Sequence, residues 1–123
     1  MTKLRTILFL LVSLAASANV ATAADPVEVI APGDAPADAV KIDIAKMKYA
    51  PATVEVEEGG VVLWTNKDAM PHNVQITDPF KVVGNMLRAG QQMAIKFNKA
   101  GEYPYSCTPH PFMKGGVKVK PKG

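Results

Sequence analysis

The residues of this sequence most able to do chemistry lie close together near its C-terminus. The segment Cys107-Thr108-Pro109-His110-Pro111-Phe112-Met113 combines a thiol, an imidazole and a thioether. The sequence contains one cysteine and two histidines, so a second imidazole can come only from His72. A cysteine with two histidines and a weak axial methionine is the ligand set of blue-copper electron-transfer sites. We therefore predict one copper ion, cycling between Cu(II) and Cu(I), at His72, Cys107, His110 and Met113.

The spacing of the three C-terminal side chains predicts that they lie on a folded loop. Residues three apart point to opposite faces of an extended strand but can converge in a tight turn. Cys107, His110 and Met113 have this spacing. Pro109 and Pro111 flank His110, and each fixes its own φ and restricts the residue before it. We expect a stiff loop, which suits a site that changes oxidation state without changing shape.

Each of these residues taken alone has a less specific interpretation. A lone cysteine is most often a small buried hydrophobe, and a lone histidine or methionine is usually structural. In an exported chain, however, an unpaired thiol would be prone to oxidation and needs another explanation. Zinc is the rival metal, but structural zinc sites use four cysteine or histidine ligands. The combination with a thioether favours copper over zinc.

Residues 1–23 have the pattern of a cleaved signal peptide. Lys3 and Arg5 precede the apolar run 7–12, and Ala21-Thr22-Ala23 fits the small-x-small cleavage rule. An uncleaved membrane anchor is the alternative, but the apolar run is shorter than the roughly 18 residues that a span needs. We expect export, cleavage near Ala23 and no membrane anchor afterwards.

Removal of this leader changes the charge of the chain. The full sequence has 14 basic and 11 acidic residues and a net charge of +3. Without Lys3 and Arg5, twelve basic and eleven acidic residues remain, a net charge of +1. Such a chain has no electrostatic footprint for nucleic acid. The basic residues Lys114, Lys118, Lys120 and Lys122 predict the solvent face and blunted edge of a final strand.

The rest of the chain is long enough for one domain. Residues 24–39 are rich in Ala, Pro and Asp and predict an irregular arm or edge strand. Residues 40–123 are assigned to the folded domain. Apolar and polar residues alternate in it over short stretches bounded by Gly and Asn, which indicates an all-β sandwich or barrel. The expected strands include 40–44, 54–57, 61–65, 72–76, 93–97, 103–107 and 117–119.

These strands would bring the four sulfur and imidazole side chains together. His72 begins one predicted strand, Cys107 ends another, and residues 108–113 lead into the last. Strands of a packed sandwich hold the loops at its ends in fixed positions. We expect the copper site near the surface at one end of the sandwich.

From about Val40 to Val119 the chain resembles the cupredoxins, and among them the amicyanins. Three blocks carry the resemblance: Asp43 to Tyr49 (DIAKMKY), Ala69 to Val74 (AMPHNV) and the loop Cys107 to Met113. The two residues between His110 and Met113 give the short form of the loop that is typical of amicyanins. The resemblance implies a Greek-key β-sandwich of about eight or nine short strands.

The resemblance also implies a role for each site residue. His72, Cys107 and His110 would be the strong trigonal ligands, with Met113 axial and weak. Asn73 would tie its strand to the ligand loop by hydrogen bonds near Thr108, since such outer residues orient the ligands of metal sites.

Amicyanins accept one electron from methylamine dehydrogenase in the periplasm and pass it to a c-type cytochrome. The resemblance implies the same partners and location here, for a chain that we expect to be a monomer. An apolar surface at the site would suit brief docking, and we expect it to comprise Met70, Pro71, Pro109, Pro111 and Phe112. The alternative buries Phe112 under the loop.

Other functions stay open on the sequence. Residues 77–92 depart from the family pattern, so a cupredoxin serving another periplasmic redox partner is one alternative. A copper-binding or trafficking protein without electron transfer is a second, and it should be colourless in air. An enzyme such as a multicopper oxidase or nitrite reductase domain would need further metal ligands. The chain has no histidines left to supply them, so we expect that it is not an enzyme.

Overall fold

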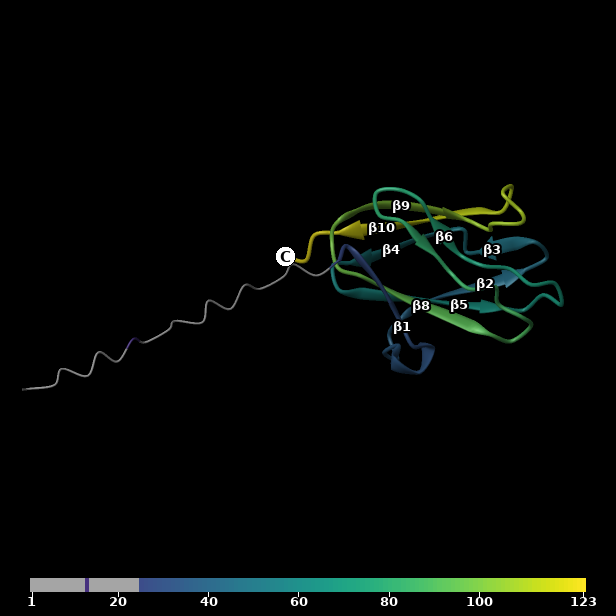
Figure 1. Cartoon of the computed structure of the whole chain (residues 1–123), viewed down its shortest axis with the longest axis horizontal. Coiled ribbons are helices and arrows are strands. Elements are labelled where there is room, and N and C mark those ends of the chain that lie inside the picture. Colours follow the sequence, from purple (N-terminus) through teal and green to yellow (C-terminus); the bar gives the residue numbers. More distant parts are fainter. Residues whose placement is uncertain (1–12, 14–24) are drawn as a thin grey trace, which may run out of the picture.

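The computed structural model describes residue 13 and residues 25–123. The predicted leader, residues 1–23, therefore lies outside the described residues apart from residue 13. Two five-stranded sheets pack against each other as a sandwich (Figure 1). Among the described residues, no helix is long and apolar enough to cross a membrane.

The first sheet has the strand order β1-β8-β5-β2-β3. Its β2 and β5 run parallel, and its other neighbouring strands run antiparallel. A 3-10 turn, η1 (Pro32–Asp34), follows the edge strand β1. The strands of this sheet are β1 (Val27–Ile30), β2 (Val40–Ala45), β3 (Lys48–Ala50), β5 (Gly60–Asn66) and β8 (Gln92–Phe97).

The second sheet has the strand order β4-β10-β9-β6-β7. Its β4 and β10 run parallel, and the remaining pairs are antiparallel. Each sheet thus contains one parallel pair of strands. The fold is an all-β sandwich, as the sequence predicts. The strands of this sheet are β4 (Thr53–Glu57), β6 (Gln75–Ile76), β7 (Val82–Val83), β9 (Gly101–Ser106) and β10 (Lys114–Lys120).

The number of strands differs from the expected eight or nine. The described residues contain ten strands, of which β3 has three residues and β6 and β7 have two each. A stretch this short cannot show the alternation of apolar and polar residues on which the prediction depends. For the same reason, the strand expected at 72–76 is reduced to β6.

The last strand is not at the edge of its sheet. β10 lies between β4 and β9, so the edge position predicted from its lysines is wrong. Lys118 and Lys120 are exposed, whereas Val117 and Val119 are buried. The alternation of lysine and valine correctly predicts which face of the strand meets the core. It does not indicate which strands lie beside it.

The core between the two sheets extends to the predicted metal ligands. Trp64 on β5 is fully buried, as are Ile42 and Ile44 on β2. Cys107 and Met113 belong to the same buried cluster as these residues. The ligand loop therefore lies directly on the packed core.

Strand direction places the predicted ligands at one end of the sandwich. β5 runs toward Asn66 and β9 toward Ser106, and β10 leaves the same end at Lys114. The connections 66–72, 86–91 and 107–113 gather there, at the right of Figure 1, and the C-terminus lies at the opposite end. We call these two regions the loop end and the far end.

Candidate metal centre

Three of the four predicted ligands meet at the loop end. The donor atoms of His72, Cys107 and His110 all lie within 4.8 Å of one another. The Sγ atom of Cys107 is 3.8 Å from Nδ1 of His72 and 3.6 Å from Nδ1 of His110. His72 and Cys107 are fully buried, and His110 is partly exposed. Both imidazoles therefore present the same nitrogen to one sulfur.

The loop that carries the other ligand candidates closes on itself, as its spacing predicts. His110 N donates to Cys107 O at 3.2 Å, and Met113 N donates to His110 O at 2.9 Å. Cys107 N then donates to Met113 O at 3.2 Å. Met113 is 2% exposed, so its thioether is buried beneath the loop together with Cys107.

The buried histidine is fixed by its backbone as well as by packing. His72 N donates to Leu87 O at 3.1 Å, and Leu87 N donates back to His72 O at 2.7 Å. This isolated bridge replaces the longer strand that the sequence predicts there. Leu87 lies in the segment 77–92, which the resemblance left unassigned, and it is itself buried.

Asn73 makes the hydrogen bonds to the ligand loop that the family resemblance implies. Its Nδ2 donates to Thr108 Oγ1 at 2.8 Å, and Thr108 N donates to its Oδ1 at 2.7 Å. Nδ2 also donates to Gly84 O at 3.1 Å. The amide is 2% exposed, so these bonds replace its contacts with water.

Two buried tyrosines lie near Asn73 and Cys107. Tyr49 donates its phenol proton to Asn73 O at 2.6 Å, and burial raises the pKa of Tyr49. Its ring meets that of Tyr105 edge to face, with 4.7 Å between centroids. Burial also raises the pKa of Tyr105, to about 12. Both side chains are therefore neutral at physiological pH.

Asp68 is a site residue that sequence reasoning missed. Nε2 of His72 lies 2.9 Å from Asp68 Oδ2, so the ring donates to the carboxylate and leaves Nδ1 free to face Cys107. The same carboxylate accepts the N–H groups of Lys46 and Met47. The bond from Met47 is the largest cause of the lowered pKa of Asp68. The one signal in the sequence is an acid four residues before a histidine.

Asn66 is a second residue near the centre that sequence reasoning missed. It is fully buried, and its Nδ2 donates to Met70 O at 3.0 Å and to Leu87 O at 2.8 Å. Asp68 N donates to its Oδ1 at 3.0 Å. The side chain of Asn66 thus connects both segments that flank His72.

The residues predicted to form an apolar surface are exposed, and His110 is partly exposed. Phe112 is 67% exposed and Met70 is 49% exposed, so the alternative that buries Phe112 under the loop is wrong. The rings of His110 and Phe112 are 6.0 Å apart between centroids. Met86, from the unassigned segment, is 43% exposed. Pro71, Pro109 and Pro111 are exposed as well.

The donor set fits copper. Two imidazole nitrogens and one thiolate sulfur, beside a buried thioether, are the ligands that select copper and set its redox potential. The side chains of Asp68, Asn73 and Tyr49 are already engaged in hydrogen bonds. A bound copper ion would supply the exchange of a single electron.

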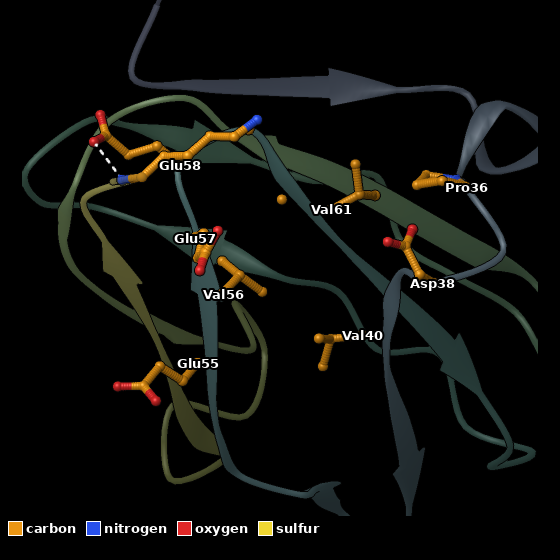
Figure 2. Close-up of a pocket in the computed structure, with 11 residues that line it drawn as sticks. Pro36, Asp38, Val40, Glu55, Val56, Glu57, Glu58 and Val61 are labelled. Atoms are coloured by element: carbon orange, nitrogen blue, oxygen red, sulfur yellow. Dashed lines mark hydrogen bonds between the residues drawn. The ribbon is translucent and has the colours of Figure 1, made fainter.

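A second hollow lies at the far end and has a different character. It has a volume of about 330 Å³, and Figure 2 shows Asp38, Glu55, Glu57 and Glu58 around it. Lys122 N donates to the Glu58 carboxylate at 3.2 Å. Its lining consists of acids, valines, small residues and Lys122, so it lacks the imidazole and thiol donors of the loop end.

Comparison with known proteins agrees with this donor set. Residues 36–120 match the family model of copper-binding proteins of the plastocyanin/azurin family. The chain is 42% identical over 121 residues to amicyanin-alpha of Methylorubrum extorquens, covering 95% of this chain and 100% of that protein. It is 46% identical over 97 residues to the amicyanin of Paracoccus versutus, covering 74% of this chain and 72% of that protein.

Solved structures give the same relationship. A proline-to-glycine variant of amicyanin in its reduced Cu(I) form superimposes with a TM-score of 0.71 at 36% identity. The alignment covers 78% of this chain and 100% of that chain.

Proposed function

The chain belongs to the plastocyanin/azurin family of copper-binding proteins as an amicyanin-type blue copper protein, and on this premise we propose its redox partners. The amicyanins and plastocyanins to which it is similar are electron carriers and not enzymes, and this protein is a blue-copper electron carrier. We propose that it accepts one electron from a dehydrogenase, methylamine dehydrogenase in particular, and passes it to a c-type cytochrome in the periplasm.

We propose that His72, Cys107 and His110 are the strong ligands and that Met113 is the weak axial one. The grouping of the first three donor atoms within 4.8 Å supports this assignment, as does the burial of Met113 beneath the same loop. The packed core below and the closed hydrogen bonds of the loop resist rearrangement. This rigidity favours fast transfer, because a rigid site changes little between oxidation states.

The surface around His110 is the proposed docking site for both partners. His72 and Cys107 are buried, whereas His110 is partly exposed beside the exposed ring of Phe112, and Met70 and the three prolines are exposed as well. The exposed ring of Phe112 beside the partly exposed His110 is the observation that carries the proposal. Such a surface can be desolvated briefly by a partner without forming a permanent complex.

The proposed periplasmic location is supported by the predicted leader at residues 1–23. The similarity of the chain to the two amicyanins is consistent with the same route. Cleavage near Ala23 would release the domain without an anchor.

Visible and EPR spectra of the copper-loaded protein, followed by stopped-flow mixing with reduced methylamine dehydrogenase, test the proposal. We expect intense blue absorption in air that bleaches on mixing and returns when an oxidised c-type cytochrome is added. A copper-loaded protein that is colourless in air would instead support the trafficking alternative. A blue protein that the dehydrogenase does not reduce, but that another reduced dehydrogenase does, would support a different partner.

A further inference from the structure

The carboxylate of Asp68 connects the buried histidine of the metal centre to a turn on a different part of the chain. His72 Nε2 donates to Oδ2 at 2.9 Å, Met47 N donates to Oδ2 at 3.0 Å and Lys46 N donates to Oδ1 at 2.8 Å. The Asp68 side chain is 19% exposed. Hydrogen bonds to a carboxylate are shorter and stronger than those between neutral groups. The three bonds to Asp68 therefore hold the His72 ring and the turn in fixed positions relative to each other.

The turn that Asp68 holds has an unusual backbone. Lys46 and Met47 join β2 to β3 with φ values of 53° and 60°. A two-residue hairpin turn with positive φ at both positions favours Asn-Gly, because other residues crowd their own backbone there. Here the sequence has Lys-Met instead. The two backbone N–H groups that converge on Asp68 offset this cost.

Asp68 is in turn fixed from behind. Its N–H donates to Oδ1 of the fully buried Asn66, and Asn66 holds Met70 O and Leu87 O. Leu87 makes the backbone bridge to His72. The position of Asp68 is therefore fixed through Asn66, which also bonds to Leu87, the backbone partner of His72.

We propose that Asp68 is a positioning residue of the metal centre, an inference that rests on the proposed copper ligands. Its carboxylate keeps the proton of His72 on Nε2 and so directs the Nδ1 lone pair at the site beside Cys107. A carboxylate bonded to a ligand imidazole also raises the basicity of that ligand. A more basic ligand stabilises Cu(II) more than Cu(I), so Asp68 lowers the reduction potential.

Replacing Asp68 with asparagine tests this role, because the amide keeps the shape but removes the charge. We expect Asp68→Asn to raise the reduction potential, measured by voltammetry, by about 59 mV, which is a tenfold change in the relative affinity for the two oxidation states. Asp43→Asn is the control, since it removes the same charge from an exposed position on β2 and should leave the potential near that of the wild type. Equal potentials for all three proteins would overturn the proposal.

A second variant separates positioning of the ligand from support of the turn. In Asp68→Ala the turn loses its partner, and the further changes Lys46→Asn and Met47→Gly supply the residues that the turn prefers. We expect the triple variant to recover the urea stability of the copper-free protein but to keep the raised potential. Recovery of both properties would show that Asp68 acts only through the turn.

The tautomer of His72 can be measured without copper. Nitrogen-15 NMR of the copper-free wild type should show the proton on Nε2, and Asp68→Ala should shift it partly to Nδ1. An unchanged tautomer would contradict the proposal. A wild-type protein that never becomes blue with copper would instead contradict the proposed function, so the two failures are distinguishable.

Discussion

At the scale of single residues, the metal centre depends on polar side chains that are buried and fully bonded. Asn73 is 2% exposed and joins three partners, two of them on Thr108 in the ligand loop. When one member of such a group is removed, the remaining donors stay buried without acceptors, at a cost of roughly 1–3 kcal/mol. The loop would also lose the tie that fixes Cys107 relative to His72.

Asn73→Ala is therefore expected to weaken copper binding about 10–100-fold, the usual effect of losing a group that orients metal ligands. Competition with a Cu(I) chelator measures this affinity. Asn85→Ala, at an exposed position, is the control and should bind as the wild type does. Wild-type affinity in Asn73→Ala would show that the ligand loop holds its shape unaided.

The sequence could predict the residues whose chemistry is distinctive, but not all of their partners. Two histidines, one cysteine and a nearby methionine leave few combinations, and the Asn73–Thr108 pair follows from the family resemblance. The bond between Asp68 and the Lys46–Met47 turn could not be predicted, because the two segments are 21 and 22 residues apart in sequence. Their meeting depends on the register of β2 against β5.

At the scale of elements, the approach of β9 to β10 depends on a glycine. A Cβ atom on Gly115 would collide with the ring of Tyr105 and lie 2.6 Å from Ala52 O. A Cβ atom on Gly116, the next residue of β10, would meet no atom within 4 Å. The ring of Tyr105, which lies two residues before Cys107, therefore packs over Gly115.

Gly115→Ala should lower the free energy of unfolding by roughly 1–3 kcal/mol, because overpacking forces side chains or backbone to shift. Gly116→Ala, the matched control on the same strand, should have a much smaller effect. Urea unfolding of the copper-free proteins measures both values. Equal stabilities would mean that β9 and β10 have room to separate.

A buried tyrosine on β9 gives the fold an alkaline limit. Tyr103 is 1% exposed and donates to Lys99 O at 2.7 Å. Burial, and secondarily the charge of Glu58, raises its pKa above the ordinary value. Because the folded state holds this proton more tightly, the contribution of Tyr103 is complete below about pH 10 and is lost as the pH rises toward the folded pKa.

Tyr103→Phe should thus be less stable than the wild type by about 1 kcal/mol near neutral pH, through loss of the hydrogen bond. We expect this difference to shrink above pH 10, as measured by urea unfolding at a series of pH values. A constant difference up to the alkaline limit of the protein would contradict the assignment of the effect to the Tyr103 proton.

The strands show which elements the alternation of apolar and polar residues can predict. Alternation predicts β2, β4, β5 and β8, which have five residues or more. It places the start of β6 three residues too early and misses β7. Pro104, which has no N–H to donate to a neighbouring strand, lies within β9, and β9 has neighbours on both sides. β6 pairs only with Tyr105 and Ser106, however, so that side of β9 is open at Pro104.

At the scale of the whole molecule, charge is unevenly distributed although the net charge after leader removal is small. The described segments 46–48, 66–72, 86–91 and 107–114 border the metal centre. They contain five basic residues and one acid, Asp68, whose carboxylate is already bonded. Lys46, Lys48 and Lys114 line one hollow together with Phe112. The acids shown in Figure 2 lie at the far end.

This distribution predicts that anionic partners approach the loop end first. Oxidation of the reduced protein by hexacyanoferrate(III), a trianion, should slow as ionic strength rises, because salt screens charges beyond about 10 Å at 0.1 M. Replacing Lys46, Lys48 and Lys114 together with glutamine should reduce both the rate and its salt dependence.

The matched control changes the same net charge at the far end and its vicinity, by replacing Lys99, Lys118 and Lys122 with glutamine. Its rate should stay closer to that of the wild type at low salt. Identical behaviour of the two triple variants would show that only the total charge matters.

The backbone of residues 107–113 bonds to itself between Cys107, His110 and Met113, and Thr108 N adds one bond to the side chain of Asn73. The two sheets therefore do not depend on the length of this segment. Residues could be inserted or exchanged between His110 and Met113. Such changes would alter the reduction potential of the copper while leaving the two sheets as they are.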